Sequence, residues 1–424
     1  MKKVLFVSYF WPPSGKATVH WPLSIIRYLP NFGWQPTVLT TSMDTFSEND
    51  ESLLHGVAAD LEVHKARAFE PFNLYRAFIG KKKRDTLVAS ETISKTNRGL
   101  RHRIAIWIRM NLLIPDARIG WYWNAVREGK KLLRSKGVSV IVSIGPPHTT
   151  LLVGNALGKA TGIPHIPVFI DPWVDIAYYR GFKRSKPTSY LDRRLERGVL
   201  ERASRVVFVT QSMKEDYERR YPFLSEKSNV LYWGYDDEAF KSYVQSKNTT
   251  TKVILHAGNI FDSQNPIALW RNIREEIDKG GNFNIVFVGT VSPEIRKSIE
   301  NAGLQDRTAY KGFLPYDSMI KELGNATYLL VCATESRHVP GKLFEYLRTG
   351  KRILAFGDDN GEVEDILRRA GTGLIFPYAY TGNDIFRQID KLVPNTDSAK
   401  QYDRKLIAKE LAKILSILPE PIKH

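Results

Sequence analysis

The chain has 424 residues, a formal net charge of +17 and one cysteine. Its composition, 43% hydrophobic and 25% charged, is typical of folded globular proteins and excludes disordered and collagen-like chains. Cys332 cannot form an internal disulfide, and no Cys/His cluster has zinc spacing, so we expect a reducing compartment and no bound metal. The apolar stretch at residues 4–11 is too short for a signal peptide and that at 104–114 is too short for a membrane span, so we expect a cytoplasmic protein.

Short β-branched and aromatic runs alternate with helical patterns along the chain, and this alternation occurs twice. Such alternation is typical of βα units and a parallel sheet. In the first half we expect strands at residues 4–9, 37–40, 61–65, 138–144, 165–170, 206–210 and 229–232. In the second half we expect strands at residues 252–257, 284–288, 308–311, 328–332, 352–355 and 373–375. The predicted fold class is α/β, with two Rossmann-like, doubly wound parallel sheets.

The two expected sheets are separated by residues 236–251, a stretch that ends in a polar run and lacks apolar periodicity. We place the boundary near residue 245, which gives an N-terminal domain of residues 1–245 and a C-terminal domain of residues 246–397. Residues 398–424 have helical periodicity without a following strand, so we expect a closing helix. Open α/β sheets bind ligands outside the carboxyl ends of their strands, and two facing domains would therefore bind ligands in the cleft between them.

The strongest local signal is VPGKLFEYLRTGKRILAFG at residues 339–357, directly after an expected strand. Pro340 suits a first helical turn, and Gly341 allows another group to approach the backbone closely. The free N–H groups of a helix N-terminus favour a phosphate, Lys342 adds a positive charge, and Glu345 on the same face can accept from vicinal hydroxyls. The spacing therefore predicts nucleotide binding, and the alternative is a surface Lys/Glu pair on an amphipathic helix.

This motif resembles the donor site of bacterial family 4 glycosyltransferases of the GT-B fold. The resemblance extends along most of the chain. The segments YFWPPSGKATVHWPLSIIRYLPNFGWQPTVLT, PDARIGW and SIGPPHTT are similar to segments of the family's polysaccharide-building members. The segments VVFVTQSMKEDYERRYPF and YWGYDDEAF resemble the family's approach to the domain linker.

The resemblance implies a retaining, metal-independent transferase without a cofactor. Its substrates would be a nucleotide-sugar donor and a glycan or lipid-linked acceptor, in the synthesis of cell-surface polysaccharide or glycolipid. The positions that match the family's donor site in the C-terminal domain are Gly258, Phe313, Leu314, Gly341, Lys342, Leu343 and Glu345.

Several of these positions carry a specific expected role. The resemblance implies that Glu345 holds the ribose, and that Lys342 with the adjoining backbone holds the diphosphate. Phe313 and Leu314, which follow the third strand of the C-terminal domain, would border the base.

Residues 335–338 occupy the loop that faces the donor sugar in the family. Glu335 is a candidate catalytic carboxylate, and Arg337 is a candidate donor-binding cation. Glu335 and Glu345 are ten residues apart, a wider spacing than that of the family's two glutamates, so an ordinary loop acid is an equal alternative for Glu335.

Four candidate residues lie after strands of the N-terminal domain. Gly15 and Lys16 sit in the first strand-to-helix loop, where a close backbone approach would stabilise the leaving phosphate. His148 follows Pro146-Pro147 and is a candidate for binding substrate hydroxyls, with a helix-start residue as the alternative. Asp171, in the sequence VFIDPW, is a candidate acid or base for the acceptor, with a helix cap as the alternative.

The loop after the first strand of the C-terminal domain departs from the family. Relatives have basic residues here that neutralise the donor diphosphate, whereas this chain has Gln264 where arginine is expected. Either Arg337, His338 and Lys16 substitute, or donor binding is weakened. The departure keeps open one alternative to transfer, a glycosyltransferase-like scaffold without catalysis. A second alternative is a nucleotide-sugar 2-epimerase on a similar fold, which needs no acceptor and no membrane-facing surface, and the basic region described below argues against it.

Basic residues are concentrated between residues 65 and 136, where 18 Lys or Arg face 5 Asp or Glu. Such a field favours a polyanion or an anionic membrane face. No recognisable nucleic-acid-binding module is present, so we expect no nucleic-acid partner. In residues 98–123, arginines at positions 101, 103 and 109 flank the apolar residues at positions 104 and 106–108. This combination predicts peripheral docking on the inner face of the cytoplasmic membrane. The alternatives are a solvated loop around Lys81-Lys82-Lys83-Arg84 and a basic helix packed on the domain core.

Overall fold

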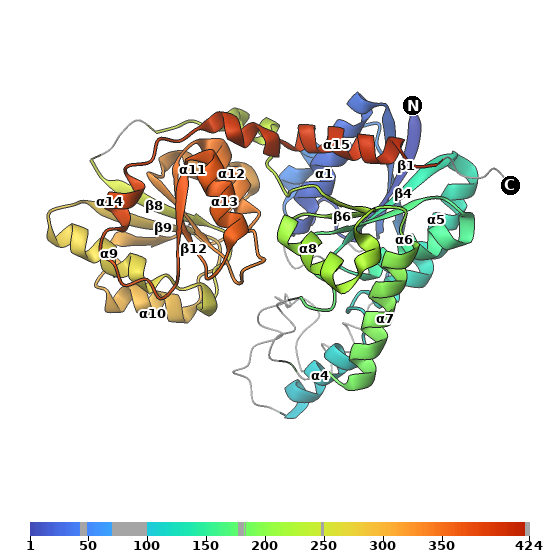
Figure 1. Cartoon of the computed structure of the whole chain (residues 1–424), viewed down its shortest axis with the longest axis horizontal. Coiled ribbons are helices and arrows are strands. Elements are labelled where there is room, and N and C mark those ends of the chain that lie inside the picture. The colour runs from blue at the N-terminus through green and yellow to red at the C-terminus, as the bar shows by residue number, and fades with distance from the viewer. Residues whose placement is uncertain (43–48, 70–99, 177–181, 183, 247–249, 420–424) are drawn as a thin grey trace. The chain divides into compact units, whose positions relative to one another are not determined.

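The computed structural model describes residues 1–42, 49–69, 100–176, 182, 184–246 and 250–419 (Figure 1). The chain divides into two compact units, which we call the N-terminal unit (Met1–Tyr232 with Ala408–His424) and the C-terminal unit (Trp233–Ile407). The last helix, α15 (Arg404–Ser416), therefore contributes residues to both units. The domain limits expected from the sequence, near residues 245 and 397, stay predictions.

The N-terminal unit contains a seven-stranded sheet in the order β3-β2-β1-β4-β5-β6-β7. Every pairing in it is parallel. All seven strands predicted for this half are present, at β1 (Lys2–Val7), β2 (Trp34–Thr41), β3 (Glu62–Ala66), β4 (Val138–Gly145), β5 (His165–Phe169), β6 (Val206–Phe208) and β7 (Ser228–Val230). Strands β2 and β3 extend the sheet on one side of β1, and the chain then returns to place β4 on the other side, as in a doubly wound sheet.

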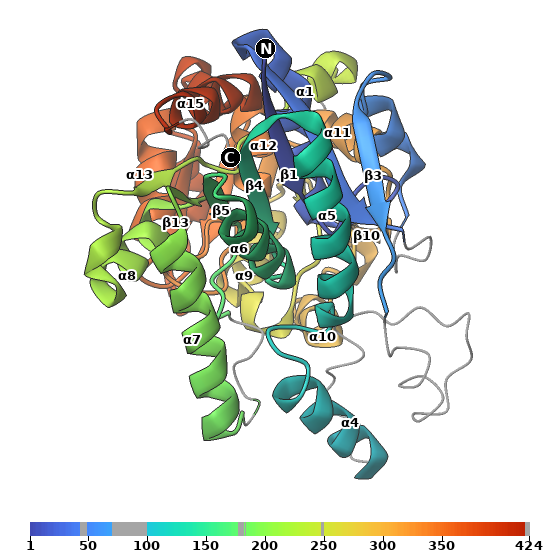
Figure 2. The same ribbon diagram turned by 90° about the vertical axis from the view of Figure 1, so that its right-hand side faces the viewer.

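Six described helices accompany this sheet: α1 (His20–Tyr28), α4 (Leu100–Asn111), α5 (Tyr122–Lys136), α6 (Thr149–Thr161), α7 (Lys186–Arg202) and α8 (Gln211–Arg220). Helices α5 and α6 lie against one face, where Val153 and Leu157 pack with Leu5 and Val7 of β1. Figures 1 and 2 show α4 and the first turns of α7 standing away from the rest of the unit. None of the described helices is long and apolar enough to cross a membrane.

The C-terminal unit contains a six-stranded sheet in the order β10-β9-β8-β11-β12-β13, again with parallel pairings. All six predicted strands are present, at β8 (Lys252–Ala257), β9 (Phe283–Val288), β10 (Thr308–Tyr310), β11 (Tyr328–Cys332), β12 (Arg352–Phe356) and β13 (Gly373–Phe376). Its other helices are α9 (Ile267–Asp278), α10 (Pro293–Asn301), α11 (Tyr316–Asn325), α12 (Lys342–Thr349), α13 (Gly361–Ala370) and α14 (Ile385–Ile389).

Local sequence signals determine where several helices begin. Ser185 caps α7 by accepting from the backbone N–H of Thr188, and Thr210 caps α8 in the same way. Helix α6 is capped by a residue far from it in the sequence. The carboxylate of Asp116, in the PDARIGW segment, accepts from both the backbone N–H and the hydroxyl of Thr149, each at 2.9 Å.

Two glycines bring the loops after β8 and β9 into backbone contact. Gly258 and Gly289 have φ of +108° and +112°, a region that disfavours side chains. A Cβ on Gly289 would lie 2.6 Å from the carbonyl oxygen of Gly258, closer than any side chain could pack. Glycine at position 289 therefore allows the carboxyl ends of these two strands to pack closely.

We expect Gly289→Ala to destabilise the protein strongly, because it adds both backbone strain of about 1–3 kcal/mol and a clash with the neighbouring backbone. Gly303→Ala is the matched control. Gly303 has φ of +66° with open space around its Cβ position, so its substitution should cost only about 1–2 kcal/mol. Chemical denaturation of both variants measures the difference in their free energies of unfolding. Equal losses of unfolding free energy would contradict the close approach of the two loops.

Candidate functional site

Lys342 begins α12 at the carboxyl edge of the C-terminal sheet, next to a buried histidine. Its Nζ lies 3.0 Å from Nε2 of His256, whose Nδ1 lies 3.0 Å from the carbonyl oxygen of Leu330. The carbonyl can only accept, so Nδ1 carries the hydrogen and Nε2 accepts from the lysine. Burial lowers the pKa of Lys342 to about 8 and that of His256 well below its usual range. The site therefore holds a poorly solvated ammonium group beside a neutral imidazole.

Glu345 lies one turn further along α12 and is 8% exposed. Its Oε1 accepts from the Tyr316 hydroxyl at 2.8 Å. Burial raises the pKa of Glu345, and the charges of Arg404 and Lys342 oppose that rise. Arg404 is itself buried and donates from Nε to the carbonyl of Trp233 at 3.0 Å. A carboxylate is thus held within reach of two cations, with Tyr316 hydrogen-bonded to Oε1.

Glycines at and near the start of α12 allow Trp233 and Lys342 to pack closely on the backbone. No side chain caps this helix, whose N-cap residue is Gly341. A Cβ on Gly341 would lie 2.7 Å from the indole of Trp233, and one on Gly258 would lie 2.7 Å from Nζ of Lys342. Gly258, Gly341 and Lys342 are therefore brought together, as the sequence predicts. Leu343 is different, because its side chain is buried and its N–H already bonds to the carbonyl of Pro340.

Phe313 and Leu314 follow β10, at the same edge of the sheet. The side chain of Phe313 is 58% exposed and that of Leu314 is half-buried. An exposed aromatic ring in this position is available to stack on a planar ligand. The expectation that Phe313 and Leu314 border the base of the nucleotide stays a prediction.

The loop between β11 and α12 is held by its own polar groups. Arg337 lies 3.5 Å from the carboxylate of Glu335, so the two candidates form an ion pair. Nδ1 of His338 accepts from the backbone N–H of Thr334 at 3.0 Å, and burial lowers the pKa of His338 to about 4. Asn360, the cap of α13, donates to the carbonyls of Glu335 and His338 at 3.0 and 2.8 Å. Asn360 therefore fixes the loop's backbone.

Gln264 does not occupy the place of a donor-binding arginine. It is buried, with Nε2 donating to the carbonyl of Cys332 at 2.6 Å and Oε1 accepting from the N–H of Phe261 at 3.1 Å. An arginine here would bury a charge and leave the N–H of Phe261 without its acceptor. Gln264 therefore has a structural role in this loop.

His148 lies at the carboxyl edge of the N-terminal sheet, at the start of α6. It is 3% exposed, and its ring stacks on Trp173 with centroids 5.1 Å apart and planes 15° apart. Burial lowers the pKa of His148 to about 4, so the ring is neutral near pH 7, while the charge of Asp192 and a backbone hydrogen bond to Asp171 oppose the shift. Nε2 is buried and has no hydrogen-bond partner among the described residues. His148 does not cap α6, because Asp116 does.

Asp171 follows β5 and is brought next to His148 by this backbone bond. The next described helix, α7, is capped by Ser185, so Asp171 is not its cap. Gly15 and Lys16 lie in the loop after β1, the neighbour of β4, and both are half-buried. In this loop the buried hydroxyl of Ser14 has no partner within the described part of the chain.

Sequence reasoning missed several residues that complete these arrangements. They are Ser14, His256, Tyr316, Asn360 and Arg404. The hydrogen bonds of the last four join segments far apart in the chain, whereas the buried hydroxyl of Ser14 has no partner among the described residues. No local motif marks any of the five. His256 had a weak signal, because a histidine within an apolar strand is unusual.

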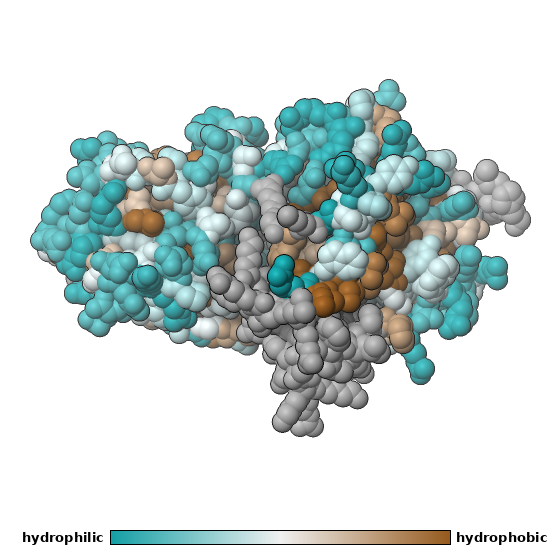
Figure 3. Space-filling model, turned by 90° about the horizontal axis from the view of Figure 1, so that it is seen from below, coloured by the Kyte–Doolittle hydropathy of each residue, from teal (hydrophilic) through white to brown (hydrophobic). Residues whose placement is uncertain are grey.

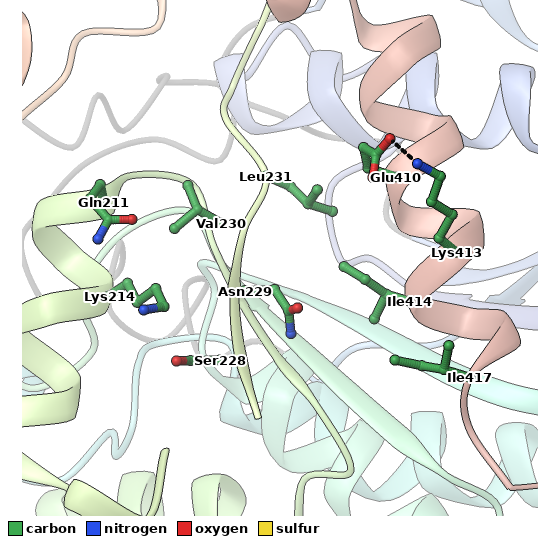
Figure 4. Close-up of a pocket in the computed structure, with 10 residues that line it drawn as sticks. All are labelled: Gln211, Lys214, Ser228, Asn229, Val230, Leu231, Glu410, Lys413, Ile414 and Ile417. Atoms are coloured by element: carbon green, nitrogen blue, oxygen red, sulfur yellow. Dashed lines mark hydrogen bonds and ion pairs between the residues drawn. The ribbon is translucent and has the colours of Figure 1, made fainter. Parts of the chain in front are cut away.

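A cavity of about 420 Å³ lies elsewhere in the N-terminal unit, between α8, β7 and α15 (Figure 4). An ion pair between Glu410 and Lys413 lies at its rim, with Nζ and Oε1 2.7 Å apart. None of the candidate residues predicted from the sequence lines this cavity.

Comparison with solved structures supports one architecture over the whole chain. Sucrose-phosphate synthase from Thermosynechococcus elongatus has a TM-score of 0.64 at 11% identity, covering 98% of each chain. HepE of Anabaena in complex with UDP-glucose has a TM-score of 0.63 at 12% identity, covering 99% of this chain and 100% of the other. A proposed UDP-N-acetylglucosamine 2-epimerase from Listeria monocytogenes has a TM-score of 0.56 at 13% identity, covering 100% of both chains. At such identities the likeness establishes the fold, which is GT-B.

The sequence also matches two family models. "Glycosyltransferase Family 4" matches residues 22–239, and "Glycosyl transferases group 1" matches residues 237–408. No curated protein matches the sequence. The first match covers more than half of the chain, and together the two matches confirm the resemblance found in the sequence. The chain belongs to glycosyltransferase family 4 and is a glycosyltransferase of the GT-B fold.

Proposed function

We propose that the protein is a retaining, metal-independent glycosyltransferase that transfers a sugar from a nucleotide-sugar donor to a glycan or lipid-linked acceptor. The product would be a cell-surface polysaccharide or glycolipid. The observation that carries this proposal is the pair formed by Lys342 and Glu345 on the first turn of α12, a helix whose N-terminus has no side-chain cap.

The donor diphosphate would lie against the start of α12. The ammonium of Lys342 and the positive end of the α12 dipole are suited to a diphosphate, whose negative charge increases as its bond to the sugar breaks. The carboxylate of Glu345 can accept more hydrogen bonds than the one from Tyr316, and it would accept from the ribose hydroxyls. HepE, a structural neighbour, binds UDP-glucose, which makes UDP the first nucleotide to test.

Charge compensation would come from the loop after β11, since none comes from Gln264. Arg337 is paired with Glu335, and it would exchange that carboxylate for a phosphate when the donor binds. Glu335 would then be released toward the donor sugar. This exchange would couple the arrival of the diphosphate to the position of the candidate catalytic carboxylate.

The acceptor would be served by the N-terminal unit. The neutral ring of His148 would accept a hydroxyl hydrogen at Nε2, and the carboxylate of Asp171 would orient the attacking hydroxyl and receive its proton. Gly15 and Lys16 would stabilise the leaving phosphate from the loop after β1. The epimerase alternative needs no acceptor, and membership of a transferase family argues against it.

We expect nucleoside diphosphates to stabilise the protein, and the affinity to fall as the pH rises from about 7 to about 9. A bound diphosphate raises the pKa of Lys342 above its free value of about 8. Binding is therefore strongest while the lysine is already charged, and above that pKa it requires uptake of a proton. Lys342→Met should weaken binding by about tenfold or more and remove this pH dependence, because it deletes a charge-assisted contact of about 1.5–3 kcal/mol.

Calorimetric titration with UDP, then with the other nucleoside diphosphates, measures both effects. The control is Lys279→Met, which removes an exposed lysine paired with Glu276 in the same unit and should bind like the parent. A pH-independent affinity, or a Lys342→Met variant that binds normally, would overturn the donor-site assignment. A parent that binds no nucleoside diphosphate would favour the scaffold alternative.

We also propose that the protein docks on an anionic membrane face through α4. This helix contains no Asp or Glu, and four apolar residues on or just after it are exposed: Ile104, Trp107, Ile108 and Leu112. Among the described side chains of α4, only Met110 and Asn111 in its last turn are buried, so its described part does not pack along its length on the core. Figure 3, seen from the side toward which α4 projects, shows brown hydrophobic atoms exposed on this unit.

The first turns of α7 also expose basic and apolar side chains together. Its first turns expose Lys186, Tyr190, Leu191, Arg193 and Arg194, whereas Asp192 and Glu196 are fully buried. The acids of this stretch point inward and the bases outward, which suits an anionic partner. Arg98 and residues 81–84 lie outside the described residues, and Arg101 has no described side chain, so they add nothing to this argument.

We expect the protein to co-sediment with vesicles containing phosphatidylglycerol but not with pure phosphatidylcholine, and salt should release it. Arg103→Glu with Arg109→Glu should weaken binding by about tenfold or more, since each basic residue near the surface contributes about 1 kcal/mol. Trp107→Ser should also weaken binding, whereas Val393→Ser, which alters an even more exposed apolar residue of the C-terminal unit, should not. Binding that is indifferent to anionic lipid would exclude this role.

A further inference from the structure

A buried carboxylate on α7 holds the tryptophan on which His148 stacks. Oδ1 of Asp192 accepts from Nε1 of Trp173 at 2.8 Å, and both side chains are fully buried. The backbone N–H of Trp173 donates to the Tyr217 hydroxyl at 2.9 Å, and that hydroxyl donates to Glu196 at 2.6 Å. The tryptophan is therefore fixed at its backbone and at the far edge of its ring.

The charge of Asp192 is balanced by Arg184, whose Nη1 lies 2.7 Å from Oδ2. The two side chains are 0% and 9% exposed, so the pair has lost almost all of its hydration. Buried ion pairs are poor stabilisers, and apolar residues of similar volume often stabilise a protein as well or better. What a carboxylate supplies here, and an apolar side chain cannot, is a directional acceptor for the indole N–H.

The orientation of Trp173 determines the plane of His148. The two rings are stacked, with planes 15° apart, and both are almost completely buried. The backbone bond to Asp171 fixes rotation within that plane. Together these contacts leave His148 one orientation, in which Nε2 is the nitrogen without a partner among the described residues.

We propose that Asp192 is a positioning residue for transfer, which acts through Trp173 to hold the His148 ring with Nε2 directed at a substrate hydroxyl. The inference rests on the proposed function in one respect, that His148 contacts substrate. Asp192 itself is buried behind Trp173 and touches no substrate. Its contribution is to keep a neutral imidazole, which carries no ion pair of its own, from rotating away from the reacting hydroxyl.

The first test reads the His148 ring directly and requires no substrate. In protein labelled with ¹⁵N-histidine, the His148 ring signals are assigned by their loss in His148→Ala. The parent should show one tautomer, with hydrogen on Nδ1. Trp173→Phe keeps the stack but deletes the indole N–H, and Asp192→Leu deletes the oxygen that accepts from that N–H. Each variant should give averaged or doubled His148 signals.

The control is Lys227→Met, which loosens the opposite end of α7. Nζ of Lys227 donates to the carbonyls of Leu200, Glu201 and Ala203, at 2.7, 3.0 and 3.2 Å. This variant should melt at a lower temperature with unchanged His148 signals. A lower melting temperature for Trp173→Phe and Asp192→Leu, with His148 signals like those of the parent, would overturn the positioning role.

The second test uses transfer or donor hydrolysis with the nucleotide sugar identified by titration. Asp192→Leu should lower kcat by about tenfold, or about 1.4 kcal/mol, with little change in KM for the donor. In a His148→Ala background the same substitution should have little further effect, because its route of action is gone. An equal loss of kcat in the parent and in the His148→Ala background would overturn the inference. A parent without nucleotide binding would instead refute the proposed function, and the ring signals would still decide the role of Asp192.

Discussion

The parallel pairing of every described strand is the constraint on which the candidate sites depend. In a parallel sheet, all loops that follow strands emerge at one edge. The loops after β1, β4 and β5 therefore share one edge of the N-terminal sheet, and those after β8, β9, β10 and β11 share one edge of the C-terminal sheet. Residues separated by more than a hundred positions, such as Lys16 and His148, are assembled by this rule without any local signal between them.

Burial then determines the charge of the groups at these edges. His148, His256 and His338 all lose charge to desolvation, so near neutral pH they act as hydrogen-bonding imidazoles and not as cations. Lys342 stays cationic near neutral pH, although its burial makes that charge costly. An ammonium in such surroundings gains more from an incoming anion than one already solvated by water. A diphosphate would therefore be attracted to Lys342, a cation that its own surroundings stabilise poorly.

The sequence predicts the two sheets well because strand and helix periods are local properties. Each expected strand is present, and the Lys342 and Glu345 pair lies on α12 as its spacing indicates. The orientation of Gln264 was not predictable, because the carbonyl of Cys332 that it binds is brought near only by the pairing of β8 with β11. The same holds for Asp116, which caps a helix 33 residues away, and for Asp192. Motifs identify residue types at sites, whereas partners distant in sequence determine which way those residues face.

The lowered pKa of Lys342 has a practical consequence for studying an enzyme whose acceptor is unidentified. An amine with a pKa of about 8 is largely unprotonated in mildly alkaline buffer, whereas ordinary lysines remain ammonium ions. Amine-acylating reagents should then modify Lys342 ahead of most of the chain's other lysines. A bound anion would both cover the amine and restore its proton, so protection from acylation, read by peptide mass, would report occupancy of this position without any transfer reaction.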